Sequence, residues 1–211
     1  MRQVKMSNRM LLPRVATAYA TVVEQLRNRG FDVSNYEGSS LNEISAMLDA
    51  KQMSIIVGSP ETGGVHVLFH VHKGLRPPQL LDFVEESYDR SASIGAGGEL
   101  MIIAKDSPND TLKNEIERLW VDDKKYVNVR GIETLQFNVI EHLLVPVHTI
   151  APTETIEILK TRLGIVRDNQ FPEISRFDAC AIAIGLRPNQ IVKITRPSRT
   201  AVVGDYYRRC I

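Results

Sequence analysis

The sequence predicts a layered α/β domain followed by a small α+β domain. Helix-like and strand-like segments alternate over residues 8–130, which is typical of helices packed on a central sheet. After about Leu135 the pattern changes to short segments punctuated by proline and glycine. No flexible spacer separates the two patterns. We therefore place the boundary where the pattern changes, which gives domains of residues 1–137 and 138–211.

The first helix is predicted between Asn8, which can cap its start, and Gly30, which can end it. Its apolar residues recur at steps of three and four and therefore share one face: Leu11, Val15, Ala18, Val22 and Leu26. Pro13 is acceptable only in the first turns of a helix, so we expect the true start nearer Leu12.

Three more helices are predicted in the first domain. Ser40 and Glu43 have the spacing of a capping box and open the first of them. Pro77-Pro78 opens the second, and Ser107-Pro108 opens the third. The expected inward-facing residues are, helix by helix, Leu41, Ile44 and Leu48, then Leu81, Val84 and Tyr88, then Leu112, Ile116 and Leu119.

Four strands are expected among these helices. Ser54–Gly58 and Glu99–Ala104 are short apolar runs suited to buried strands. Val65–His72 alternates, and Tyr126–Val129 is the fourth strand.

The second domain begins with a strand-like run, Gln136–Val145, that Pro146 ends. Thr153 can cap a helix that finishes at Gly164. The expected inward residues of this helix are Ile156, Leu159 and Leu163. Ile191–Thr195 alternates as a strand.

The composition excludes several classes of protein. The chain has 26 Lys+Arg against 25 Asp+Glu and is 43% hydrophobic, which is ordinary for a globular protein and unlike a disordered one. Two cysteines, Cys180 and Cys210, are too few for a disulfide scaffold or a four-cysteine zinc site. The longest apolar runs, such as Leu100–Ala104, are far too short to span a membrane. We expect a soluble intracellular protein with no membrane partner.

The near-neutral charge is the sum of two unlike parts. Residues 1–138 hold 16 basic and 18 acidic residues, a net of −2, whereas residues 139–211 hold 10 and 7, a net of +3. Within 187–209 there is one acid, Asp205, and a set of six basic residues: Arg187, Lys193, Arg196, Arg199, Arg208 and Arg209. This cluster is either a solvated face or a docking surface for an acidic partner or for nucleic acid.

Histidine, glycine and cysteine residues give only weak signals of chemistry. One strand face carries His66, His70 and His72. No further ligand is evident near these histidines, so a polar face is favoured over a metal site. Gly95–Gly98 precedes a strand, whereas a phosphate-binding loop follows one, so a tight turn is favoured. Cys180 reads as a core residue, and Cys210 has no histidine nearby to make it a nucleophile.

A metal-dependent nuclease needs an acid on one strand and Asp/Glu-x-Lys on the next. The segments that start at Glu61 and Glu99 lack lysine at the required step, and Glu157 precedes Lys160 at the wrong spacing. No serine elbow, Walker motif or HExxH is present. The sequence favours a protein that is not an enzyme and needs no cofactor or metal. A nuclease and a free-standing DNA-binding factor remain the alternatives.

The C-terminal third carries a series of motifs in a fixed order. They are Glu141-His142-x-Leu144-Val145-Pro146-x-His148, Asn169-Gln170-Phe171-Pro172-x-Ile174, Asp178, Gly185, Gln190-Ile191-Val192-Lys193-Ile194-x-Arg196-Pro197-Ser198-x-Thr200-Ala201 and Tyr207-Arg208. This stretch resembles the assembly domain of the fifth subunit of DNA-directed RNA polymerases, the Rpb5/RPABC1 family, which has an archaeal counterpart. A weaker likeness at Arg29-Gly30-Phe31-x-Val33, and at Met101-Ile102-Ile103 before Ser107-Pro108, extends over the rest of the chain.

The resemblance implies an N-terminal jaw domain with a nuclease-like α/β topology but no catalytic residues. It also implies a C-terminal assembly domain that docks on the largest polymerase subunit, next to neighbouring small subunits. The jaw would lie near downstream duplex DNA, and its net charge of −2 argues for a weak contact. We expect no homo-oligomer. The expected location is the nucleus, the nucleolus for a polymerase that makes ribosomal RNA, or the cytoplasm for a virus-encoded protein.

The resemblance also assigns residues to these contacts. Those expected to meet the largest subunit are Glu141, His142, Pro146, Gln170, Pro172, Asp178, Gln190, Lys193, Arg196, Pro197, Ser198, Thr200, Tyr207 and Arg208. Lys193 and Arg196 suit charge-assisted hydrogen bonds to a partner, with an internal ion pair as the alternative. The residues expected near DNA are Lys105, Ser107 and Pro108, where a helix N-terminus would meet a phosphate.

The chain departs from the family pattern at three places. Phe177-Asp178-Ala179 stands where the family usually has Gly-Asp-Pro, Arg199 replaces an acid, and Val202 replaces a glycine. The charge reversal at Arg199 alters an expected contact. The departures favour a diverged paralogue that serves one polymerase class or a virus-encoded version.

Overall fold

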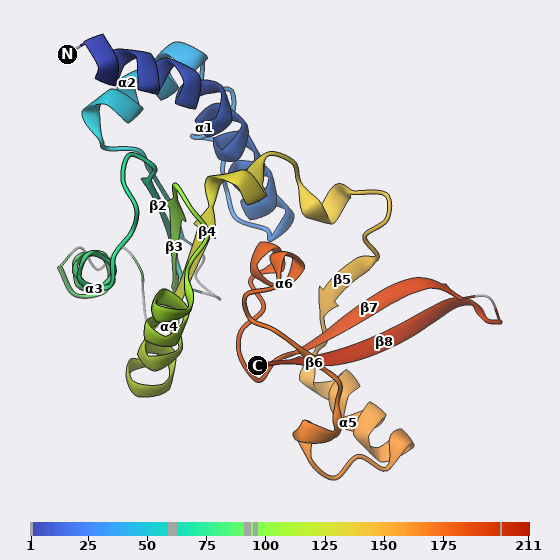
Figure 1. The fold of residues 1–211 in the computed structure, drawn as a ribbon. Coiled ribbons are helices and arrows are strands. Elements are labelled where there is room, and N and C mark those ends of the chain that lie inside the picture. The colour runs from blue at the N-terminus through green and yellow to red at the C-terminus, as the bar shows by residue number, and fades with distance from the viewer. Residues whose placement is uncertain (1, 59–62, 91–93, 95–96, 199) are drawn as a thin grey trace. The chain divides into compact units, whose positions relative to one another are not determined.

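The computed structural model describes residues 2–58, 63–90, 94, 97–198 and 200–211. The predicted turn at 95–98 therefore lies partly outside the described residues, as does Arg199. Two compact units make up the chain, Met1–Phe137 and Asn138–Ile211, which we call unit 1 and unit 2. Both combine helices with a four-stranded sheet, so the mixed α/β character expected from the sequence is confirmed (Figure 1).

The sheet of unit 1 has the spatial order β1-β2-β3-β4. Its strands are β1 (Ser54–Val57), β2 (Val65–His70), β3 (Glu99–Ala104) and β4 (Tyr126–Gly131). β1 runs antiparallel to β2, whereas β2, β3 and β4 are parallel. Every residue of β3 and β4 is buried, as expected for parallel strands with both faces covered.

Four helices accompany this sheet: α1 (Arg2–Asn28), α2 (Leu41–Ala50), α3 (Pro77–Glu85) and α4 (Asp110–Asp123), with a π-helical turn η1 (Glu86–Arg90) after α3. The capping box at Ser40 and Glu43 is present, as predicted. The start expected at Ser107-Pro108 is wrong by two residues, because Asn109 caps α4 and accepts a hydrogen bond from the Leu112 N–H.

The expected start of α1 near Leu12 is also wrong. The helix begins at Arg2 and continues through Pro13. Pro13 lies on the exposed side, where its missing N–H removes one helical bond without leaving a buried polar group. The Thr17 hydroxyl donates a hydrogen bond of 3.0 Å to the Pro13 carbonyl.

Burial in α3 differs from the predicted stripe. Leu80 and Val84 are buried one turn apart, whereas Leu81 is 42% exposed. The predicted stripe is therefore shifted by one residue at its start, because Leu80 rather than Leu81 lies four residues before Val84. Leu41 in α2 is likewise exposed, and Ile44 and Leu48 are buried as expected.

The outer edge of β1 is closed by a tyrosine side chain. The Tyr36 hydroxyl accepts a hydrogen bond of 3.1 Å from the Ile56 N–H and donates one of 3.0 Å to the Ile56 carbonyl. Ile56 lies between Ile55 and Val57 in the pairing with β2, so its own backbone groups point away from that strand. One side chain thus satisfies both outward backbone groups of Ile56, which a further strand would otherwise pair with.

Unit 2 contains a second four-stranded sheet in the order β5-β7-β8-β6. Its elements are β5 (Val147–Ile150), α5 (Thr153–Leu163), β6 (Glu173–Ile174), α6 (Ala179–Ile184), β7 (Ile191–Ser198) and β8 (Val202–Cys210). β7 and β8 form an antiparallel hairpin, and β5 and β6 flank it (Figure 1). Val192, Ile194 and Cys210 form part of the core on one face of this sheet.

The strand expected over Gln136–Val145 is not formed. A 3-10 turn, η2 (Ile132–Leu135), precedes this stretch, and a second, η3 (Val139–Glu141), lies within it. The strand starts only after Pro146. Asn138 explains the difference, because its side chain accepts the Ile140 N–H and starts the second turn.

The predicted burial of α5 is only partly correct. Ile156 and Leu159 pack against buried core residues, but Leu163 is 59% exposed. Pro152, rather than Thr153, occupies the N-cap position.

None of the helices in the described ranges is both long enough and apolar enough to cross a membrane.

Candidate functional site

The β7–β8 hairpin carries six of the residues predicted to meet a partner: Lys193, Arg196, Pro197, Ser198, Tyr207 and Arg208. Directly opposite residues share a face, so the register sorts them into two sets. Lys193, Pro197 and Tyr207 lie on one face of the hairpin, and Arg196, Ser198 and Arg208 lie on the other. The two faces have different electrostatic characters.

Lys193 is held in an ion pair within the hairpin. Its Nζ lies 3.0 Å from a carboxylate oxygen of Asp205, and the Thr195 hydroxyl donates a 2.8 Å hydrogen bond to the same carboxylate. The hydrogen bond to Asp205 raises the pKa of Lys193, and the hydrogen bond from Lys193 lowers the pKa of Asp205. The internal ion pair considered for Lys193 is therefore present in the folded chain, and its contact with a partner stays a prediction.

Arg196 has a different environment. Its guanidinium lies 3.6 Å from the centre of the Tyr206 ring, in a cation–π contact. A Cβ on Gly204 would come within 3.4 Å of this ring, so Tyr206 lies against the glycine. No carboxylate among the described residues pairs with Arg196, which is exposed. The stacked guanidinium presents donors to solvent in a fixed orientation.

The turn between β7 and β8 is held by Ser198. Its hydroxyl oxygen accepts hydrogen bonds of 3.4 Å from the N–H groups of Thr200 and Ala201. Val202 follows with a φ of 59°, in the left-handed region that a β-branched residue rarely adopts. The Val203 N–H donates a 2.5 Å bond to the Ala201 carbonyl across it. Val202 is the position at which the resemblance leads us to expect glycine.

At the base of the hairpin, the predicted contact residues contribute to folding. Tyr207 packs against the cluster of Phe171 and Ile191. Arg208 donates a hydrogen bond of 3.2 Å to the Glu173 carbonyl and remains exposed. Pro172, which directly precedes β6, accepts the Arg209 N–H at 2.8 Å.

Three other predicted contact residues organise local backbone. Gln190 accepts the Arg187 N–H at 2.8 Å, and Gln170 accepts the N–H groups of Val166 and Arg167 at 2.7 and 2.9 Å. Asp178 caps α6 through the N–H groups of Cys180 and Ala181. Their side-chain oxygens thus have structural tasks within unit 2.

The segment before β5 is exposed. Glu141 and His142 lie at its start, and the His142 Nδ1 accepts a hydrogen bond of 3.2 Å from the Leu144 N–H. The Pro146 carbonyl lies 2.6 Å from the His148 ring. Two leucines in this segment, at positions 143 and 144, are 96% and 82% exposed. Sequence reasoning missed Tyr206 and these leucines, although the paired leucines inside a predicted contact motif were a usable signal.

The residues expected near DNA lie in the loop between β3 and α4. Lys105 and Ser107 are exposed, and Pro108 is half-buried. A Cβ on Gly131 would meet the Ser107 backbone nitrogen and hydroxyl at 2.7 Å, so the loop packs closely on the end of β4. Asp106 lies beside Lys105 in the chain and reduces the local positive charge.

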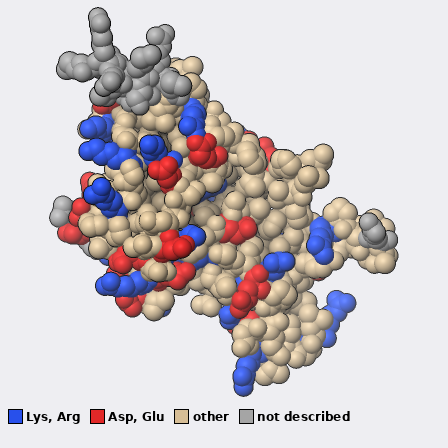
Figure 2. All heavy atoms as spheres, in the orientation of Figure 1, with Lys and Arg blue, Asp and Glu red and all other residues tan. Residues whose placement is uncertain are grey.

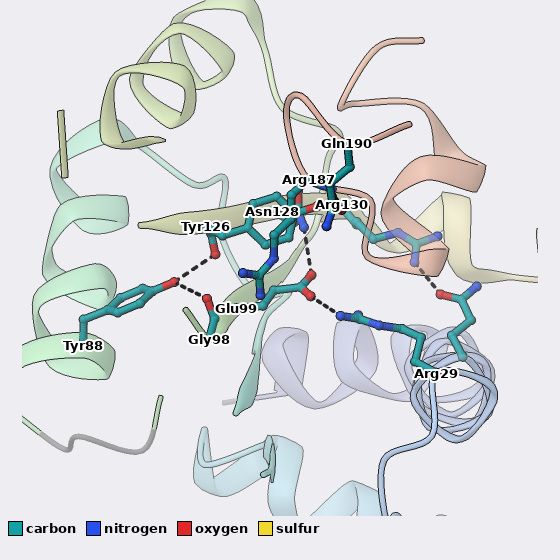
Figure 3. A network of polar contacts seen from close by, with 10 residues as sticks. Arg29, Tyr88, Gly98, Glu99, Tyr126, Asn128, Arg130, Arg187 and Gln190 are labelled. Atoms are coloured by element: carbon teal, nitrogen blue, oxygen red, sulfur yellow. Dashed lines mark hydrogen bonds and ion pairs between the residues drawn. The ribbon is translucent and has the colours of Figure 1, made fainter. Parts of the chain in front are cut away.

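A buried polar network in unit 1 contains Glu99, one of the acids that fail the spacing of a metal-dependent nuclease (Figure 3). Glu99 accepts hydrogen bonds of 2.5 Å from Arg29 and 2.8 Å from Asn128. Arg130 donates to Gln25 at 2.6 Å, and burial lowers its pKa to about 10 against the opposing charge of Glu99. Glu99 thus neutralises buried arginines instead of facing a substrate.

Tyr88 links η1 to the sheet of unit 1. Its hydroxyl lies 3.1 Å from the Gly98 carbonyl and 3.0 Å from the Tyr126 carbonyl (Figure 3). This arrangement fixes the start of β3 beside the start of β4, where Glu99 lies.

The histidines and cysteines show no reactive arrangement. His66 is buried, and its Nδ1 lies 3.1 Å from the Ser87 hydroxyl. No group of three potential metal ligands occurs within the described part of the chain. Burial raises the pKa of the Cys210 thiol to about 11 and also raises that of Cys180, which suppresses the thiolate in both.

Comparison with known proteins assigns the family. A model described as RNA polymerase Rpb5, C-terminal domain, matches residues 137–210. DNA-directed RNA polymerase subunit Rpo5 of Archaeoglobus fulgidus is 42% identical over 74 residues, which are 35% of this chain and 96% of the relative. The chain belongs to the Rpb5 family of RNA polymerase subunits.

Similarity to Rpb5-family proteins also extends into unit 1. Subunit rpabc1 of DNA-directed RNA polymerases I, II, and III from Dictyostelium discoideum is 25% identical over 191 residues, covering 90% of this chain and 94% of the relative. The corresponding RPABC1 of Caenorhabditis elegans is 43% identical over 78 residues, 36% of each chain. The resemblance read from the C-terminal motifs is thereby confirmed.

Proposed function

We propose that this Rpb5-family chain is a non-catalytic subunit of a multisubunit DNA-directed RNA polymerase and docks on the largest subunit through unit 2. One observation carries the proposal: the family match covers residues 137–210, which is nearly the whole of the compact unit 138–211. A docking surface must stay complementary to its partner. We therefore expect related subunits to be most similar in sequence in the unit that carries this surface.

The exposed groups of unit 2 suit such a contact. Arg196 presents an unneutralised guanidinium on Tyr206, and leucines 143 and 144 offer apolar side chains that the unit itself does not cover. We expect neighbouring small subunits of the polymerase to lie next to this docking surface as well.

For unit 1, we propose the role of a jaw with a nuclease-like topology near downstream duplex DNA. The position of Glu99 in a buried network supports a scaffold without catalysis. A weak DNA contact fits the loop of Lys105, Ser107 and Pro108, because the acids around it limit attraction to phosphate. As a subunit of a nuclear polymerase, the protein would lie in the nucleus. As a subunit of the polymerase that makes ribosomal RNA, it would lie in the nucleolus.

Affinity purification of the full chain from its own cells, followed by mass spectrometry, tests this function. The expected result is recovery of a largest polymerase subunit in stoichiometric amount, and the identity of that subunit gives the polymerase class. Recovery of the chain alone, from extracts in which the polymerase is intact, would contradict the proposal.

A further inference from the structure

The distal half of the β7–β8 hairpin extends past its neighbours in unit 2 (Figure 1). β5 pairs with β7 only from Val192 to Thr195, and β6 pairs with β8 only at Arg209 and Cys210. On the side of β8 that faces away from β7, no strand in the described part of unit 2 pairs with Val202 to Arg208. That stretch of β8 is therefore an open sheet edge.

The backbone of β8 alternates between its two sides. The Cys210 N–H donates to the Gln190 carbonyl on the β7 side, and the Arg209 N–H donates to Pro172 on the β6 side. By the two-residue period of an antiparallel strand, the N–H and C=O groups of Tyr207 and Asp205 also face the β6 side. Pro172 has no N–H with which to continue the ladder toward Tyr207, so the pairing ends there.

The opposite edge of the hairpin is closed to a further strand. The Ala151 N–H donates to the Ile191 carbonyl, which shows that odd-numbered residues of β7 face β5. Beyond the end of β5, the next such residue is Pro197, which has no N–H to offer. An added strand can therefore pair with β8 but not with the distal part of β7.

The side chains beside the open edge favour a negatively charged partner strand. On one face, Asp205 is neutralised by Lys193. On the other face, Arg196 stacks on Tyr206 and Arg208 lies two residues further along β8, with no described carboxylate on that face of the hairpin. A strand laid along β8 would place alternate side chains next to these two arginines.

We infer that the open edge of β8 binds an extended, acidic segment of the largest polymerase subunit by strand addition. The backbone groups of Asp205 and Tyr207 pair with the segment, and its carboxylates meet Arg196 and Arg208. This inference rests on the proposed function and specifies how the docking surface works. A second copy of this chain fits less well, because edge-to-edge pairing would bring like charges together on one face.

The test is a proline substitution at the outward-facing N–H. Asp205→Pro removes that N–H and adds a ring at the edge, while the hydrogen bonds to β7 run through Gly204 and Tyr206. Asp205→Ala is the matched control, since it also loses the ion pair with Lys193 but keeps the N–H. Each full-length variant is co-expressed with the largest polymerase subunit from the same source, and circular dichroism and thermal melting verify that it folds.

Asp205→Pro is expected to weaken the association about tenfold or more, with Asp205→Ala close to wild type. Equal binding by both variants, or equal loss in both, would overturn strand addition. So would a dimer of the lone chain, seen by analytical ultracentrifugation, that Asp205→Pro abolishes. If wild type fails to bind the largest subunit at all, it is the proposed function that fails, which separates the two conclusions.

The acidic character of the segment is tested separately on the side chains. Arg196→Glu together with Arg208→Glu is expected to reduce binding more than tenfold, whereas Arg162→Glu with Lys51→Glu makes the same charge change away from the hairpin and leaves binding unchanged. Equal loss in both pairs would mean that only net charge matters and would overturn the specific contact.

Discussion

Val202 has a backbone conformation that its β-branched side chain disfavours. It holds a φ of 59° at the end of the hairpin turn and is 82% exposed. A left-handed conformation costs an L-residue with a Cβ about 1–2 kcal/mol, and it costs glycine almost nothing. The side chain gains little burial to offset this cost.

We therefore predict that Val202→Gly raises the free energy of unfolding by about 1 kcal/mol. Chemical denaturation of the full chain measures the change. Val203→Gly, at a neighbouring exposed strand position without a positive φ, is the control and is expected to lower stability. A lower stability for Val202→Gly would show that the turn does not strain the valine.

Lys193 and Arg196 are three residues apart, yet they have different tasks. Lys193 is already paired with Asp205, whereas Arg196 stacks on Tyr206 without a carboxylate. Arg196→Glu is expected to reduce recovery of the largest polymerase subunit about tenfold or more, because a repulsive charge replaces the free guanidinium. Lys193→Ala is expected to have a much smaller effect. Co-purification compares the two, and equal effects would contradict the distinction.

Among the elements, β3 is joined by a largely buried ion pair to Arg29, the residue that directly follows α1. Glu99 is 1% exposed and Arg29 is 14% exposed at their side chains, 2.5 Å apart. Removing one partner leaves a buried charge without compensation.

Glu99→Ala is expected to lower the free energy of unfolding by about 3 kcal/mol or more, measured by chemical denaturation. Glu117→Ala on the exposed side of α4 is the control, with an expected change below about 0.5 kcal/mol. If the free energy of unfolding falls as little as it does in the control, the ion pair of Glu99 contributes no net stability to the folded state.

Strand β2 makes the stability of unit 1 dependent on pH. Burial lowers the pKa of His66, against the attraction of Glu86. Burial, with repulsion from His72 and Lys73, lowers that of His70. Both imidazoles therefore charge less readily in the folded than in the unfolded state, where the pKa is about 6.5. Their neutral forms impose no penalty above that pH, and protonation opposes folding as the pH falls through 6.5 toward the folded pKa.

The predicted result is a fall in the free energy of unfolding between pH 7.5 and pH 5, measured by urea denaturation at each pH. His66→Gln should make this fall shallower, because one of the two imidazoles with a lowered pKa is gone. An identical pH profile in the variant would contradict the role of His66.

Elements with local signals were predictable from sequence, and those set by distant contacts were not. The capping residues of α2 lie next to the backbone that they satisfy, so Ser40 and Glu43 sufficed. Residues 136–145 are an exception, because the local Asn138 side chain starts a turn within a run that is apolar like a strand. In the candidate site, only the register of β7 with β8 reveals that Asp205 reaches Lys193 and that Tyr206 supports Arg196. That register cannot be read from spacing alone.

For the whole molecule, the net charge of +1 is the sum of −2 over residues 1–138 and +3 over residues 139–211. Figure 2 shows acidic and basic side chains intermixed over the face of unit 1 that it presents, without a broad field of one sign. Non-specific DNA binding depends on a concentration of Lys and Arg that releases counterions from phosphate.

We predict that the free chain binds duplex DNA with a Kd weaker than about 100 μM at 0.15 M salt. Fluorescence anisotropy with a labelled duplex measures this, with a basic DNA-binding domain as the positive control. A Kd below about 1 μM would instead favour a free-standing DNA-binding factor. Cleavage of the duplex with Mg²⁺ present, abolished by Glu99→Gln, would favour a nuclease.

The hydroxyl of Tyr36 has a consequence for which sheet edges the folded chain leaves open. By occupying both backbone groups of Ile56, it removes the pairing groups of that residue from the outer edge of β1. If a partner joins by strand addition, as we propose for β8, this hydroxyl disfavours a competing addition at β1.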